Sequence, residues 1–102
     1  MKALPVMAAM TMACGAVHAA DAQALYVRSL AATCANCHGT DGRTVDGSAV
    51  PALAGMPATY LVEQMKAFKA GTRQATVMHQ IAKGYDDRQI DQIAAYFAAQ
   101  KK

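Results

Sequence analysis

The chain has little cysteine and little net charge, and the small charge argues against one class of partner. Three of its 102 residues are cysteines, and ten lysines and arginines against seven acidic residues leave a formal net charge of +3. So small a positive charge does not favour a nucleic-acid partner. No group of nucleophile, acid and base is visible outside one motif near Cys34, so we do not expect the chain to catalyse a reaction by itself.

The sequence also lacks the alternation of apolar and polar residues that is typical of strands, and it has no repeats or low-complexity tracts. Apolar residues recur at helical spacing instead. The helices expected from this spacing cover about 22–32, 58–71, 76–83 and a last segment that begins after Asp86. Glycines and prolines punctuate residues 39–57, which predicts a long ordered loop. The sequence therefore predicts a small all-helical domain.

The last helix has the clearest start. Asp86 and Gln89 form a capping-box pattern, in which each side chain bonds the backbone N–H of the other residue. The buried stripe expected after this cap consists of Ile90, Ile93, Ala94 and Phe97.

The first 19 residues have the pattern of a secretory signal peptide. Lys2 precedes an apolar run from Ala3 to Val17, and small residues follow at the positions that a signal peptidase reads. We expect cleavage after Ala19, a periplasmic protein, and a mature domain of residues 20–102. The run is too short and too interrupted to favour stable insertion in a membrane.

Two readings apply to Cys14, which lies within this segment. A lipoprotein signal prefers a leucine-like residue three positions earlier, where this chain has Thr11. Cys14 is therefore interpreted as part of the discarded signal, with lipidation as the alternative.

The mature chain of about 83 residues retains two cysteines, Cys34 and Cys37. A domain of this size often needs a staple, a metal or a cofactor to complete its core. A disulfide between these two would close a very short loop and would stabilise little. A large apolar cofactor tied to both thiols would supply the missing core.

Residues 34–38 read C-A-N-C-H, which is the attachment motif of c-type haem. Cys34 and Cys37 would bond the two haem vinyl groups, and His38 would donate Nε2 to the iron. A thioredoxin-like dithiol is the first alternative, but no βαβ pattern surrounds the motif. A zinc site is the second, but it needs four ligands, and only His79 remains to be added.

The sequence leaves the partners of His38 open. Its Nδ1–H needs an acceptor, for which the carbonyl of Pro51 is a candidate, although a proline there can equally just shape a turn. Three methionines compete for the opposite side of the iron. Met65 is better interpreted as core, Met78 is favoured over Met56 because enough chain precedes it, and His79 is a rival beside Met78.

Several segments resemble class I cytochromes c of the c4 and c553 type. The residues that carry this resemblance are 34–42, 53–55, 60–61, 68–71 and 93–97. Residues 75–85 look like the methionine-ligand segment in the cytochrome subunit of flavocytochrome c sulfide dehydrogenase.

The resemblance implies the small all-α class I cytochrome c fold, with helices wrapped around one covalent haem. Carried over by position, His38 and Met78 would be the axial ligands and Cys34 and Cys37 the thioether attachments. The carbonyl of Pro51 would accept the hydrogen bond of His38, and Leu53 would pack on the haem.

The resemblance also implies a role in periplasmic electron transfer. The donor would be a flavoprotein (FAD) sulfide dehydrogenase subunit, and the acceptor a downstream cytochrome or oxidase. With one C-x-x-C-H motif, the chain would receive and release electrons at the same haem. The alternatives are a freestanding diffusible carrier and a haem enzyme or ligand sensor with an open iron site. The basic residues that could steer an acidic partner are Lys66, Lys69, Arg73 and Lys83.

Overall fold

The computed structural model of the chain describes residues 1–3 and 14–102, and the regular structure in these ranges is entirely helical. The elements are α1 (Cys14–Ala32), α2 (Ala35–His38), the 3-10 turn η1 (Thr40–Gly42), α3 (Ala58–Ala70), α4 (Met78–Ala82) and α5 (Asp87–Ala98). The predicted all-α class is confirmed, and no strand occurs in the described ranges.

Helix α5 forms as its sequence predicts. The Asp86 carboxylate accepts a hydrogen bond from the Gln89 backbone N–H at 2.8 Å, and the Gln89 side chain accepts from the Asp86 N–H at 3.0 Å. The whole predicted stripe is buried: Ile90, Ile93, Ala94 and Phe97. The cap satisfies N–H groups that the first turn leaves unpaired, so the helix begins at a defined residue.

Helix α3 also matches its predicted range. It ends where Gly71 adopts a left-handed conformation with φ 77°, which a residue without a Cβ tolerates well. Leu61 is buried, whereas Met65 and Phe68 on the same predicted face are half-buried. Helix α4 lies beside α3 and is shorter than the predicted segment 76–83.

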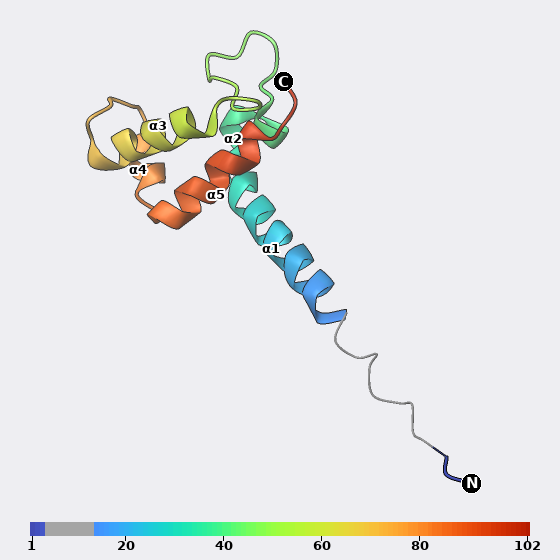
Figure 1. The fold of residues 1–102 in the computed structure, drawn as a ribbon. Coiled ribbons are helices and arrows are strands. Elements are labelled where there is room, and N and C mark those ends of the chain that lie inside the picture. Colours follow the sequence, from blue (N-terminus) through green and yellow to red (C-terminus); the bar gives the residue numbers. More distant parts are fainter. Residues whose placement is uncertain (4–13) are drawn as a thin grey trace.

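The start of the first helix was predicted wrongly. Helix α1 begins at Cys14, not near residue 22, because the alanine-rich chain favours helix on both sides of the expected cleavage point. Residues 18–26 are all exposed, and this half of α1 projects away from the other helices (Figure 1). The greater part of the predicted signal sequence, residues 4–13, lies outside the described residues, as does the side chain of Cys14.

One core joins the ends of α1, α3 and α5. Its buried members are Ala31, Leu61, Ile93, Ala94 and Phe97. The loop predicted for residues 39–57 follows α2 and contains η1 and then an irregular stretch up to Pro57, from which Leu53 and Met56 pack against this core. Among the helices described between residues 14 and 98, none is long and apolar enough to cross a membrane.

Candidate functional site

Helix α2 is a single turn that carries the C-x-x-C-H motif. Its first bonds run from the backbone N–H groups of Cys37 and His38 to the carbonyl of Cys34, at 3.3 and 2.9 Å. Residues three and four apart lie on the same side of a helical turn. The two sulfurs and the imidazole therefore leave the backbone on one side of this turn.

The two thiols are free and differ in environment. Cys37 is exposed, whereas Cys34 is half-buried. Burial raises the pKa of the Cys34 thiol, and the nearby Cys37 adds to this, while the hydroxyl of Thr33 acts in the opposite direction. Because neither cysteine is in a disulfide, both sulfurs are available for thioether bonds.

The ring of His38 is buried, with 8% of the residue exposed. Its Nδ1 lies 2.7 Å from the carbonyl oxygen of Pro51. Because a carbonyl only accepts, Nδ1 must carry the hydrogen, and Nε2 of the neutral ring is then free to bind a metal. The hydrogen bond that the sequence analysis anticipated between His38 and Pro51 is present.

The turn after His38 is held against the loop that carries Pro51. The Gly42 carbonyl accepts hydrogen bonds from the backbone N–H groups of Leu53 and Ala54, at 2.8 and 3.2 Å. A Cβ on Gly42 would lie 2.8 Å from Cδ1 of Phe97 and 2.9 Å from the nitrogen of Ala54. Only glycine fits at this point of close approach, where φ is also 77°.

The candidate ligands for the other side of the iron lie on different elements. Met78 is the first residue of α4 and is half-buried, and Met65 is half-buried on α3. Met56 packs against the core cluster. His79, the rival beside Met78, has a buried Nδ1 without a hydrogen-bond partner among the described residues.

A basic cavity of about 670 Å³ lies between the end of α3 and α4. Its charged lining consists of Lys69, Arg73 and Lys83, with His79 beside them. Arg73 is fixed there by a 2.5 Å hydrogen bond to the Gln64 side chain and by its position 4.6 Å from the Phe68 ring centroid. Three of the four basic residues proposed to steer a partner are thus grouped, whereas Lys66 does not line this cavity.

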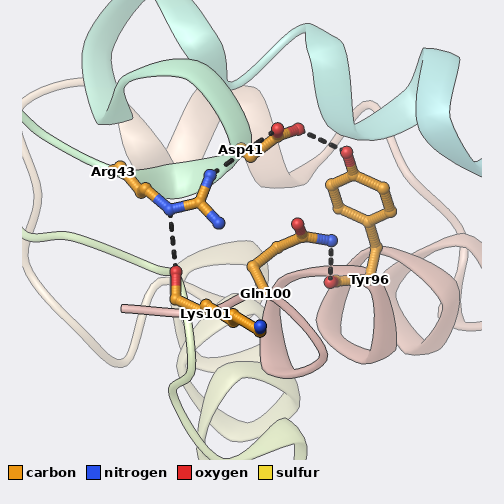
Figure 2. A network of polar contacts seen from close by, with 5 residues as sticks. All are labelled: Asp41, Arg43, Tyr96, Gln100 and Lys101. Carbon is orange, nitrogen blue, oxygen red and sulfur yellow. Dashed lines mark hydrogen bonds and ion pairs between the residues drawn. The ribbon is translucent and has the colours of Figure 1, made fainter.

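A polar network that the sequence did not reveal joins the turn after His38 to α5 and the C-terminus (Figure 2). The Tyr96 hydroxyl donates to Oδ1 of Asp41 at 2.5 Å, and Arg43 Nη1 lies 3.7 Å from Oδ2. Arg43 Nε donates to the Lys101 carbonyl at 2.8 Å. Asp41 and Tyr96 were noted only as members of family-like segments, and no local pattern indicates that they pair.

The donor set fits a covalently attached haem. Two free thiols and an imidazole with a fixed tautomer leave one helical turn, which is what attachment and axial ligation require. Large apolar side chains in α3, in α4 and at the residue before α4 are also exposed, as in a domain that packs around a cofactor: Tyr60, Ile81 and Val77. In the described part of the chain no three His, Cys, Asp or Glu side chains converge as a metal-ion site would require.

Comparison with known proteins agrees with this site. A family model of cytochrome c matches residues 19–101. The cytochrome subunit of sulfide dehydrogenase from Chlorobaculum tepidum is 43% identical over 68 residues, which cover 67% of this chain and 60% of the relative. Cytochrome c-554(548) from Halomonas halodenitrificans is 42% identical over 72 residues, which cover 68% of this chain and 86% of the relative.

Among solved structures, a cytochrome c4 from Acidithiobacillus ferrooxidans matches with a TM-score of 0.61 and 39% identity. The match covers 65% of this chain and 37% of that chain. The chain thus spans less than two thirds of both the sulfide dehydrogenase subunit and this cytochrome c4. With the helical fold and the C-x-x-C-H turn, these matches show that the chain belongs to the cytochrome c family, which binds haem c covalently and transfers electrons.

Proposed function

We propose that the chain transfers single electrons in the periplasm through one haem held by Cys34 and Cys37, with His38 and Met78 as axial ligands. The observation that carries this proposal is the 2.7 Å hydrogen bond from His38 Nδ1 to the Pro51 carbonyl. It fixes the tautomer and orientation that a metal-bound histidine needs. The haem, when bound, supplies a one-electron couple, and methionine opposite histidine favours a relatively high reduction potential.

The other residues of the proposed site hold this arrangement. The Pro51 carbonyl increases the electron density on the His38 ring, which makes Nε2 a stronger donor. Leu53 is half-buried, packs against the core cluster and follows Pro51 closely, so it is proposed as an apolar haem contact. Met78 is preferred to Met56 because Met56 is packed against the core.

We further propose that the electron donor is a flavoprotein (FAD) subunit that oxidises sulfide, and that a downstream cytochrome or oxidase accepts the electron. Two observations support this partner. Residues 75–85 resemble the methionine-ligand segment in the cytochrome subunit of flavocytochrome c sulfide dehydrogenase. The Chlorobaculum relative is named the cytochrome subunit of sulfide dehydrogenase. The basic cavity beside α4 is complementary to an acidic partner surface.

The ratio of flavin to haem tests the partner directly. We would purify the tagged protein from its native periplasm at low salt and then add sulfide. Flavin near one per haem, with reduction of the haem by sulfide, is expected for a dehydrogenase subunit. Haem without flavin, and no reduction by sulfide, would contradict the proposed partner and leave the electron-transfer role intact.

A freestanding diffusible carrier is the second candidate. This chain covers 86% of the Halomonas relative, whose name, cytochrome c-554(548), mentions no dehydrogenase. A carrier should present a small polar docking face, whereas a permanent subunit needs a larger apolar interface. In sedimentation velocity, a single species with the mass of the monomer and no flavin absorbance would favour the carrier.

Export is part of the same proposal. Residues 1–19 would be removed as a signal peptide, and residues 20–102 would form the haem domain. The family match begins at residue 19, close to the proposed cleavage point. Residues 18–26, which lie on both sides of this point, are exposed, so the proposed cleavage site is accessible to a peptidase.

A further inference from the structure

His38 belongs to a closed ring of backbone and hydrogen bonds. The chain runs from His38 to Gly42, whose carbonyl accepts from Leu53 N–H at 2.8 Å. It then returns from Leu53 to Pro51, whose carbonyl accepts from His38 Nδ1 at 2.7 Å. Because the ring is closed, any shift of one arm changes the geometry of the His38 hydrogen bond.

Adjacent residues of α5 hold the two arms of this ring. The Tyr96 hydroxyl donates to Asp41 on the first arm at 2.5 Å. The Phe97 carbonyl accepts from the backbone N–H of Gly55, two residues beyond the second arm, at 2.9 Å. Phe97 itself is buried in the core and meets the Tyr96 ring edge-on, with centroids 5.4 Å apart. Helix α5 therefore acts as a rigid reference for both arms.

Asp41 is held in an unfavourable backbone conformation. Its φ of 54° makes it the one non-glycine residue with positive φ in the described part of the chain. Such a conformation costs about 1–2 kcal/mol and persists only where surrounding contacts enforce it. The hydrogen bond from Tyr96, at 2.5 Å, is the shorter of the two contacts given for the Asp41 carboxylate. The pair with Arg43, at 3.7 Å between the exposed Arg43 side chain and the half-buried Asp41 carboxylate, is worth about 0–1 kcal/mol.

We infer that Tyr96, acting through Asp41, is a positioning residue that sets the strength of the His38–Pro51 hydrogen bond and thereby the reduction potential of the haem. The inference rests on the proposed role of His38 as an axial ligand. A strong hydrogen bond to Nδ1–H makes the imidazole a better donor and stabilises ferric iron. Loss of the Tyr96 bond lets the turn relax, weakens the His38 bond and raises the potential.

Two substitutions remove this contact from opposite sides. Tyr96→Phe deletes the donor, and Asp41→Gly deletes the acceptor while keeping a residue that tolerates positive φ. In the haem-loaded ferrous protein we expect each to speed hydrogen exchange at His38 Nδ1 by about three- to tenfold, because a hydrogen bond contributes about 1 kcal/mol. The midpoint potential should rise in both. The double variant should be no worse than either single one, because both lose the same contact.

Two further variants serve as controls. Asp41→Asn keeps an oxygen that can accept from Tyr96 and tolerates positive φ, so it should restore the wild-type exchange rate and potential. Tyr26→Phe removes another tyrosine hydroxyl bonded to α5, which accepts from the Gln89 side chain at 3.1 Å, but this contact lies outside the ring. It should change neither readout.

The outcomes separate this inference from the proposed function. In the ferric wild-type protein, absence of paramagnetic shifts on the His38 ring would refute axial ligation itself. If those shifts are present but both Tyr96→Phe and Asp41→Gly keep the wild-type rate of hydrogen exchange at His38 Nδ1 and the wild-type midpoint potential, the inference is overturned. The proposed function would then still stand. A lower melting temperature without a change in exchange or potential would also overturn it, because that result describes a purely structural contact.

Discussion

At the scale of single residues, the two proposed ligands are supported by very different surroundings. His38 ends a helical turn and has its ring fixed by Pro51. Met78 begins the short helix α4, and its neighbour His79 has a buried nitrogen without a partner among the described residues. The identity of the sixth ligand is therefore the residue-scale question with the largest functional consequence.

We predict that Met78→Ala opens the sixth coordination position. Alanine has no donor atom, so the ferrous protein should bind carbon monoxide rapidly and completely at neutral pH, whereas the wild type should not. His79→Ala is the matched control and should behave as wild type. Opening of the site by His79→Ala alone would assign the ligand to His79, and complete binding by the wild type would favour an enzyme or sensor with open iron.

Tyr96 makes the folding stability depend on pH, and the direction of this dependence follows from its pKa shift. The hydrogen bond to Asp41 raises the pKa of the Tyr96 hydroxyl above its usual 10.0, with smaller contributions from burial and from the Asp41 charge. Below pH 10 the hydroxyl is protonated in both folded and unfolded chains, so the stabilisation from this bond is fully present. It is lost as the pH rises through the raised pKa of the folded state.

At neutral pH the Tyr96→Phe variant should therefore be less stable than wild type. As the pH rises from neutral to strongly alkaline, the free energy of unfolding of the variant should fall less than that of wild type. Urea unfolding midpoints of both proteins, measured across this range, provide the test. Tyr26→Phe again serves as control, and its difference from wild type should stay constant with pH. A difference between wild type and Tyr96→Phe that does not shrink above pH 10 would contradict the assigned pKa shift.

At the scale of elements, the capping box decides where α5 begins. Helix α5 supplies four residues of the buried stripe and both contacts that hold the ring around His38. Its start is specified locally, since Asp86 and Gln89 satisfy each other's backbone N–H groups. The element that organises the site is thus also the one most clearly encoded in the sequence.

Asp86→Ala should lower the free energy of unfolding by about 1 kcal/mol, because the Gln89 N–H loses its acceptor. Asp87→Ala, one residue inside the helix, removes a charge near the N-terminus without removing the cap and should cost about 0.3 kcal/mol. Denaturant unfolding of the haem-loaded proteins measures both. Equal losses in the two variants would mean that charge, rather than the cap bond, stabilises the start of α5.

At the scale of the whole molecule, the exposed half of α1 and the basic cavity lie at different places on the fold. The exposed half of α1 extends outward from the other helices (Figure 1). The cavity is lined by residues at the end of α3, in the segment that follows it and in and just after α4. The first concerns how the chain is processed, and the second concerns how it meets a partner. Each leads to a separate prediction.

Protein recovered from the periplasm and denatured should have the mass of residues 20–102 plus one haem. The haem should survive denaturation because two thioether bonds hold it, whereas a Cys34→Ser, Cys37→Ser double variant should release it. Intact-mass spectrometry measures both. A chain that begins at Cys14 and carries a lipid would instead establish the lipoprotein alternative.

Lys83→Ala should slow electron transfer from the co-purified donor at low salt, and the difference from wild type should vanish at high salt as screening removes steering. Lys101→Ala, which removes an exposed charge near the C-terminus, should have little effect. Stopped-flow rates across a salt series provide the measurement. An unchanged rate for Lys83→Ala at low salt would exclude this lysine from steering.

Most of the fold follows from local patterns. The helical spacing of apolar residues, the Asp86 cap and the terminating Gly71 predicted α3 and α5 because each signal acts within one or two turns of chain. The start of α1 was wrong because the alanine-rich segment favours helix whatever processing follows.

By itself the sequence determined the chemistry of attachment, since two thiols and a histidine at this spacing occupy one turn wherever that turn lies. Only the tertiary structure decided what holds the turn after His38 in place. The pairing of Asp41 with Tyr96 joins segments far apart in the chain, as does the bond between Gly55 and Phe97. Such contacts depend on how α5 packs across the turn, which no local pattern encodes, because the same residues would satisfy their hydrogen bonds with water if the helix lay elsewhere.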